Sequence, residues 1–149
     1  MTQENKELLL KDLCARLFYK PIVQIDGCGI WNLRGIDNDD SVIVWHGENH
    51  PSSKNSFPII ECKPYLFPML SMTEEMLEEL NANGFFKYRD TIVNVSHLES
   101  KNGISKEIYT YIDIESISFL TEYFHYHHID YRGLIPMGLA IDATGLNIY

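Results

Sequence analysis

The hydrophobic pattern of this sequence changes its period once, near residue 20, and that change limits what the chain can fold into. Residues 4–18 repeat apolar side chains at helical spacing, and Pro21 ends the pattern because the residue before a proline is pushed out of the helical region. The residues that follow alternate apolar and polar side chains, as β-strands do, with turn-forming residues between the runs. An N-terminal helix followed by short strands predicts the α+β fold class.

The helical wheel of residues 4–18 predicts which side chains of this first helix are buried. Its apolar arc includes Cys14, which we therefore expect to be a buried and unreactive thiol. Arg16 falls elsewhere on the wheel, as do the lysines of this segment. The remaining members of the apolar arc are Leu9, Leu10, Leu13 and Leu17.

The strand region has the pattern of a small antiparallel β-meander. Asp26-Gly27 is a two-residue hairpin signal, and the turn requires a positive φ at Gly27. Pro58 cannot donate a ladder hydrogen bond, so its strand is expected at an edge of the sheet. Such a meander either stays open or curls into an SH3-like barrel. The expected strands are 22–25, 29–36, 41–46 and 57–62.

The middle of the chain predicts a short capped helix and a second hairpin. The helix is expected over 72–83, because Ser71 and Glu74 form a capping-box pattern and Gly84 follows as a stop signal. Strands at 91–96 and 107–112 are expected to pair with each other, since Asn102-Gly103 lies between them.

The C-terminal part predicts an aromatic helix over 114–128, followed by a tail that packs on the body of a single domain, residues 1–149. Apolar residues lie on two sides of this helix, and Tyr123 and Tyr126 share one of them. A helix of this kind is either buried between two layers or presents an aromatic surface to a partner.

A cluster of histidines near residue 127 raises the question of a metal site. On a helix His125, His127 and His128 point in different directions, so the three cannot converge on one ion. We therefore expect no metal and no cofactor. The alternative set is Glu122, His125 and His128, with help from His46, and it would serve a metal-assisted hydrolase. Nucleophile-elbow, H-E-x-x-H and Walker motifs are absent from the sequence, so no catalytic residues are predicted.

Arg132 is the only basic residue after Lys106, and it follows an acidic helix within Asp130-Tyr131-Arg132. An arginine so isolated is expected to pair with a nearby carboxylate such as Asp130, Glu122 or Asp142. Two roles stay open for it: an ion pair that fixes the tail, or recognition of an anionic group on a partner. The candidate tail-binding or partner-binding residues are therefore Tyr123, Tyr126, Asp130, Tyr131 and Arg132.

The charge balance excludes some partners. The chain carries 12 basic and 21 acidic residues, a net charge of −9, so direct binding of nucleic acid or of an anionic membrane is not expected. No apolar run is long enough to span a membrane, and the N-terminus lacks the pattern of a signal peptide. Three cysteines without a paired motif are typical of a reducing compartment, which predicts a cytoplasmic protein.

Several blocks of the sequence carry a family resemblance. Lys6–Leu17, Lys63–Met69, Ser71–Glu75 and, most specifically, His127–Ile135 resemble small proteins of unassigned activity encoded by phages, prophages and mobile elements of Bacteroidetes bacteria. The resemblance implies a gene on a mobile element in a bacterial host cell. It implies no activity, site or cofactor.

These observations favour a non-enzymatic accessory protein that acts through protein–protein interaction. The metal-assisted hydrolase is one alternative. The other is an acidic decoy that occupies a basic, DNA-binding protein of the host.

Overall fold

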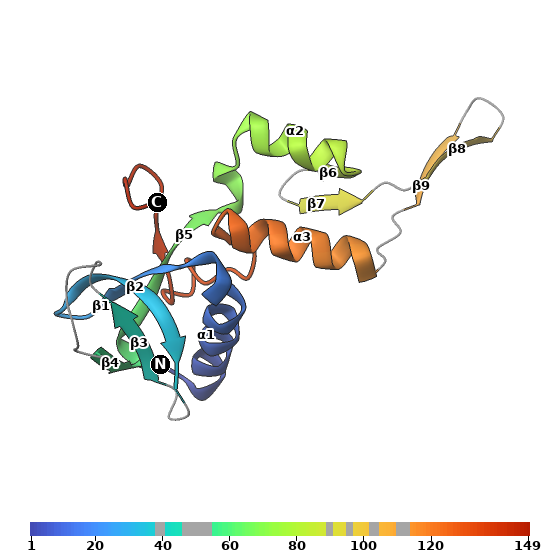
Figure 1. Ribbon diagram of the computed structural model, residues 1–149. Coiled ribbons are helices and arrows are strands. Elements are labelled where there is room, and N and C mark those ends of the chain that lie inside the picture. The colour runs from blue at the N-terminus through green and yellow to red at the C-terminus, as the bar shows by residue number, and fades with distance from the viewer. Residues whose placement is uncertain (38–40, 46–54, 89–90, 95–96, 102–104, 110–113) are drawn as a thin grey trace. The chain divides into compact units, whose positions relative to one another are not determined.

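The computed structural model describes residues 1–37, 41–45, 55–88, 91–94, 97–101, 105–109 and 114–149 (Figure 1). Helices and a mixed β-sheet make up the fold, which confirms the predicted α+β class. The chain divides into two compact units, unit 1 (Met1–Pro68 with Phe124–Tyr149) and unit 2 (Met69–Tyr123), and each is described by itself. The expectation of a single domain stays a prediction.

Helix α1 (Gln3–Arg16) begins after Thr2, whose hydroxyl accepts a hydrogen bond from the Asn5 amide at 3.2 Å. A 3₁₀ turn, η1 (Leu17–Tyr19), follows, and Lys20 leaves it with a φ of 53°. The N-terminal helix is therefore confirmed, although its α-helical part ends two residues before the expected position.

The buried face of α1 differs from the expected apolar arc. Cys14 is exposed, whereas Asp12 and Arg16 are completely buried together with Leu9 and Leu13. These four residues span an arc of about 100° at the helical repeat, and Cys14 lies outside it. The expectations for Cys14 and Arg16 were wrong because two opposite charges that bond each other can share a buried face with leucines.

The meander is present and antiparallel. Its first two strands have the expected bounds, but the turn between them contains three residues, 26–28, and not the two that Asp26-Gly27 indicates; the Cys28 amide donates to the Ile25 carbonyl at 3.0 Å. Gly27 has a φ of 71°, which confirms the positive φ expected there. The four strands are β1 (Ile22–Ile25), β2 (Gly29–Ile36), β3 (Ser41–Trp45) and β4 (Asn55–Pro58).

The expected strand 57–62 is divided between two strands. Pro58 ends β4, which is an edge strand as expected, and a 3₁₀ turn, η2 (Ile59–Glu61), then leads into β5 (Cys62–Pro68). Strand β5 returns to pair antiparallel with β1, so the order is β5-β1-β2-β3-β4. Among the described residues the pairing forms an open path, and no pairing closes the sheet into the alternative SH3-like barrel.

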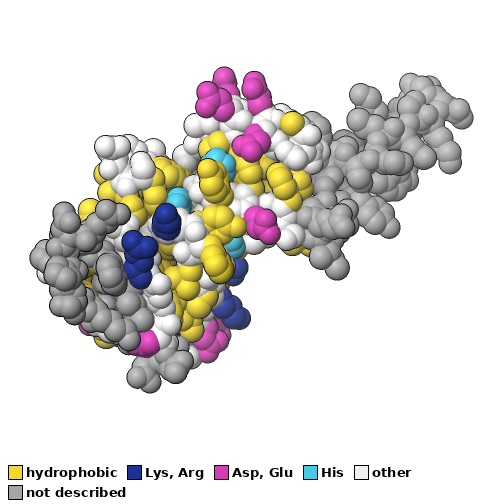
Figure 2. Space-filling view, viewed as in Figure 1, with side chains coloured by type: hydrophobic (Ala, Val, Ile, Leu, Met, Phe, Trp, Pro, Cys, Tyr) yellow, Lys and Arg dark blue, Asp and Glu magenta, His cyan; other side chains and the backbone are white. Residues whose placement is uncertain are grey.

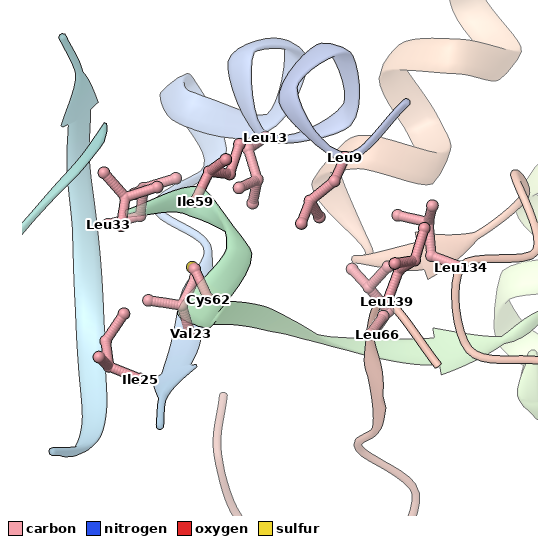
Figure 3. Packing of buried hydrophobic residues seen from close by; sticks show 12 residues of the cluster. Leu9, Leu13, Val23, Ile25, Leu33, Ile59, Cys62, Leu66, Leu134 and Leu139 are labelled. Carbon is pink, nitrogen blue, oxygen red and sulfur yellow. The ribbon is translucent and has the colours of Figure 1, made fainter. Parts of the chain in front are cut away.

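The tail packs on unit 1, as predicted, and it also adds strands to the sheet. Strands β10 (Ile129–Asp130) and β11 (Ile141–Asp142) both pair in parallel with β5. Leu134 and Leu139 of the tail lie opposite Leu9 of α1 in the core (Figure 3). The hydrophobic core of unit 1 is therefore built from both ends of the chain.

In unit 2, helix α2 (Glu74–Ala82) follows a 3₁₀ turn, η3 (Met69–Ser71). Thr73, and not Ser71, is its N-cap, since the Thr73 hydroxyl accepts from the Met76 amide at 3.3 Å. Gly84 has a φ of 82° directly after the helix, which fits the expected stop.

The strands of unit 2 pair differently from the expected hairpin. Strand β7 (Thr91–Asn94) pairs with β6 (Phe85–Tyr88), a strand that the sequence pattern did not predict. Strand β9 (Ser105–Tyr109) pairs with β8 (His97–Lys101), and the turn signal Asn102-Gly103 lies outside the described residues. Helix α3 (Ile114–Tyr126) comes next and ends two residues earlier than expected.

Candidate functional site

A buried pair of opposite charges lies at the centre of unit 1. The Arg16 guanidinium donates to both carboxylate oxygens of Asp12, from Nε to Oδ2 at 2.7 Å and from Nη2 to Oδ1 at 3.1 Å. Both side chains are 0% exposed. Because the two residues are four apart on α1, the helix itself sets the geometry of this bidentate pair.

Arg16 also bonds the backbone of the C-terminal part of the chain. Its Nη2 donates to the Ile129 carbonyl at 2.9 Å, and its Nη1 donates to the Phe124 carbonyl at 3.4 Å. These two carbonyls belong to β10 and to the end of α3. One buried guanidinium therefore connects α1 to the segment that carries most of the candidate site residues.

Arg132 pairs with Asp12 of α1, so its expected pairing with Asp130, Glu122 or Asp142 was wrong. The Arg132 Nε lies 3.3 Å from the Asp12 Oδ1, and the Arg132 side chain keeps 27% of its surface exposed. The sequence could not show this pairing, because Asp12 lies in the first helix and reaches Arg132 only through the fold.

Asp130 instead organises the backbone of the tail. Its carboxylate is buried and accepts hydrogen bonds from the Leu134 and Ile135 amides, both at 2.8 Å. These bonds fix the turn that follows β10 and direct Leu134 into the core. The structure therefore places Asp130 in a tail-holding position and not at the surface.

Tyr131 connects the two arginines to His125. Its hydroxyl accepts from the Arg132 Nε at 2.9 Å and lies 3.0 Å from the His125 Nε2. Its ring stacks on Phe124, and the guanidinium carbons of Arg132 and Arg16 lie 5.0 and 5.7 Å from its centroid. The Tyr131 hydroxyl can accept from the Arg132 Nε and donate to the His125 Nε2 at the same time when His125 is neutral.

The electrostatic surroundings keep His125 neutral. Burial and the nearby positive charge of Arg16 lower the pKa of His125 to about 4. His128 is also buried, and its pKa is lowered to about 4 by burial and then by the same guanidinium. Its ring stacks on Tyr149 with centroids 3.8 Å apart, and its Nδ1 lacks a hydrogen-bond partner within the described part of the chain.

The alternative metal set is not assembled. Among the described residues, no three His, Cys, Asp or Glu side chains are grouped so that they could hold one metal ion. Glu122 is exposed and accepts a hydrogen bond from the Ser118 hydroxyl at 3.4 Å. His46 lies outside the described residues.

The two candidate tyrosines of α3 have different surroundings. Tyr123 is buried in unit 2, where its hydroxyl donates to the Met76 carbonyl at 3.0 Å and lies 3.2 Å from the Glu79 carboxylate. Burial, together with the Glu79 charge, raises the pKa of Tyr123 to about 12. Tyr123 therefore serves the core of unit 2, whereas Tyr126 in unit 1 is 66% exposed.

Tyr126 lies beside aromatic residues that the sequence analysis did not select. Its ring packs edge-on against Tyr19, with centroids 6.4 Å apart, and Tyr19 also contacts the His125 ring at 5.9 Å. Phe18, the neighbour of Tyr19 in η1, is 93% exposed. We call Phe18, Tyr19 and Tyr126 the aromatic surface. Figure 2 shows hydrophobic side chains reaching the surface of unit 1 beside Lys, Arg and His side chains.

The residues that sequence reasoning missed are Asp12, Arg16, Phe18 and Tyr19. The signal for the first two was their i, i+4 spacing with opposite charges on the same face as Leu9 and Leu13. No comparable signal marked Phe18 and Tyr19, which were expected at the last position of the first helix and directly after it. Comparisons of this chain with family models, with curated proteins and with solved structures find no match, so what the site does is inferred from its own residues.

Proposed function

We propose that this protein acts by binding another protein through the aromatic surface of unit 1. The observation that carries the proposal is the 93% exposure of Phe18, in a turn whose Leu17 packs against the core. Single exposed apolar residues are common, but here a second exposed aromatic residue, Tyr126, is joined to the same turn through Tyr19. Aromatic residues are enriched in protein interfaces and provide much of their binding energy.

The support beneath the aromatic surface is rigid, which favours recognition. Tyr19 rests on His125, which is bonded to Tyr131, and Arg16 holds the backbone at Phe124 and Ile129. A surface held in place before binding loses less conformational entropy when the partner docks. Nothing in this arrangement requires a catalytic step.

The biological setting of the proposal comes from the sequence resemblance. We place the interaction in the cytoplasm of a bacterial host cell, with the gene on a phage or another mobile element. The described residues include no helix that is long and apolar enough to cross a membrane.

Photo-crosslinking with an unnatural aromatic residue tests the proposal. Placed at position 18 or 126, the probe should crosslink to the same protein in a bacterial lysate, because both positions belong to one surface. The matched control places it at Ile60, which is 54% exposed in the same unit. Purified partner should bind the wild type and fail to bind a folded Phe18→Ser/Tyr126→Ser double variant. Equal labelling from position 60, or unchanged binding by the double variant, would contradict the proposal.

The acidic decoy is a second candidate, and one observation in unit 2 favours it. Helix α2 exposes the carboxylates of Glu74, Glu75, Glu78 and Glu79, and Figure 2 shows acidic side chains gathered over this helix. The same photo-crosslinking residue, placed at position 78 instead of Glu78, tests this second candidate. Crosslinking to a basic protein from position 78, and not from 18 or 126, would favour the decoy.

A further inference from the structure

We propose that Arg132 is the recognition residue for a carboxylate of the partner, an Asp or Glu side chain on a protein segment that docks beside the aromatic surface. This inference rests on the proposed function, since it names the chemistry that the same surface selects. It is carried by the way in which the guanidinium of Arg132 is held.

One edge of the Arg132 guanidinium is fixed by the protein. Its Nε donates to the Tyr131 hydroxyl at 2.9 Å and lies 3.3 Å from the Asp12 carboxylate, while its central carbon lies 5.0 Å from the Tyr131 ring centroid. All of these contacts use Nε or the face of the group. Nη1 and Nη2 have no partner in the part of the chain that the structure describes, and they form the end-on fork that matches a carboxylate.

The local charge also favours an anion. Two guanidinium groups, Arg16 and Arg132, share the single carboxylate of Asp12. The Asp130 carboxylate is occupied by two backbone amides, and His125 and His128 are buried and neutral near pH 7. Within the described residues Arg132 therefore has one ion-pair partner, which it shares with Arg16, and 27% of its side chain is exposed.

Arg132 is connected to the aromatic surface through the buried His125. Rings and hydrogen bonds link Tyr126 to Tyr19, Tyr19 to His125, His125 to Tyr131, and Tyr131 to Arg132. Because each link is a direct contact, the proposed segment would cover Tyr126 with an apolar side chain and reach Arg132 with an acidic one. A carboxylate accepts two parallel hydrogen bonds from such a fork, and bonds of this charged kind are stronger than neutral ones.

Selection of random peptides on the immobilised full chain tests the assignment. Peptides retained by the wild type and lost on the Phe18→Ser/Tyr126→Ser variant should be enriched in Asp or Glu beside an apolar residue. For one such peptide, replacing its acidic residue by the corresponding amide should weaken binding to the wild type at least about tenfold. The same replacement should change binding to an Arg132→Gln variant by less than about twofold, because the fork is already missing.

Two further variants separate recognition from folding. Arg132→Lys keeps the charge and the fold but lacks the fork, so it should recover only part of the affinity for the acidic peptide. Arg34→Gln is the matched control, since it removes an exposed arginine from β2 of the same unit, and it should bind the peptide normally. Thermal unfolding of each variant confirms that a loss of binding is not a loss of folding.

The outcomes distinguish this inference from the proposed function. Peptides that need Phe18 and Tyr126 but show no acidic preference, or bind Arg132→Gln normally, would overturn the role of Arg132 and leave the aromatic surface standing. If the wild type retains no peptide that depends on the aromatic surface, both proposals fail. Self-association of the wild type that disappears in Arg132→Gln would assign the fork to a second copy of this chain and overturn the assignment to another protein.

Discussion

Two arginines contact the carboxylate of Asp12, and they differ in their exposure to water. Arg16 is completely buried and uses all three of its nitrogens, on Asp12 and on the carbonyls of Phe124 and Ile129. Arg132 reaches the same carboxylate through Nε alone and keeps 27% of its side chain exposed. We call these the closed side and the open side of the Asp12 cluster.

The difference shows how burial separates two residues of one type. On the closed side a missing hydrogen bond cannot be replaced by water, so each bond made by Arg16 contributes to stability. On the open side the Arg132 side chain is partly exposed, so water can replace a bond that it loses. The ion pair between Arg132 and Asp12 therefore contributes little to stability. Nη1 and Nη2 of Arg132, which have no partner among the described residues, are therefore able to bind another group.

Arg16→Met should have the largest effect on stability. The change leaves the Asp12 carboxylate short of its main partner and removes the guanidinium hydrogen bonds to the Phe124 and Ile129 carbonyls, at a cost of about 3–5 kcal/mol in the free energy of unfolding. Urea unfolding followed by circular dichroism measures this loss. The matched control is Lys11→Met, which removes an exposed charge from the same helix.

A double variant makes the Arg16 prediction sharper. Replacing Asp12 by Leu in the Arg16→Met background removes the buried charge, so a large part of the lost stability should return. If Arg16→Met lowers the free energy of unfolding by no more than Lys11→Met does, the buried bonds of Arg16 do not stabilise the fold as we expect.

Acid should lower the stability of the folded protein through two buried histidines near Arg16, His125 and His128. The pKa values of His125 and His128 are about 4 in the folded protein, against 6.5 for an ordinary histidine. As the pH falls from 6.5 toward 4, the unfolded chain therefore takes up protons that the folded chain does not, and stability falls. Well above pH 6.5 these groups have no effect on the pH dependence, and well below pH 4 they cause no further loss.

His128→Asn isolates one of these two groups. Asparagine tolerates the left-handed backbone at this position, where φ is 54°, and it does not titrate. Between pH 6 and 4.5, roughly the middle of the window, the slope of stability against pH should be smaller than in the wild type by up to about 1.4 kcal/mol per pH unit. An unchanged slope in urea unfolding would show that His128 is protonated in the folded protein.

Arg132→Gln should have the smallest effect on stability, about 1 kcal/mol or less, because Asp12 keeps both of its bonds to Arg16. The measurement is the same urea titration, with Arg34→Gln as the control for loss of an exposed arginine. A loss of about 3 kcal/mol or more would mean that the open side also holds the tail in place, and the comparison between the two sides would fail.

Local patterns in the sequence predicted the elements better than their partners. The positive φ at Gly27, the edge position of Pro58 and the stop at Gly84 all follow from the chemistry of single residues, and the structure has them. The expected pairing of Thr91–Asn94 with residues 107–112 was wrong. Its partner is Phe85–Tyr88, and the sequence pattern gave no signal for a strand there.

The candidate site was predicted in part. Arg132 was selected for its isolated charge, Tyr131 as its neighbour, and Tyr126 for its place on the aromatic side of the helix; the contacts through His125 and Tyr19 connect the three. Tyr123 was selected for the same side of the helix as Tyr126 but is buried in unit 2. The helical wheel places both tyrosines on one side, and only their surroundings decide which of them reaches the surface.

The sequence by itself determined the α+β class, the three helices, the first three strands of the meander and the acidic character of the chain, because hydrophobic period, turn residues and charge are local properties. Only the tertiary structure decided that Asp12 and Arg16 are buried and that Arg132 pairs with Asp12. Residues 12 and 132 are far apart in the chain, and their contact exists because the C-terminal tail adds strands to β5 and packs Leu134 against α1. A charged group is tolerated inside a protein only where the fold supplies its partner, and that partner is not a property of the local sequence.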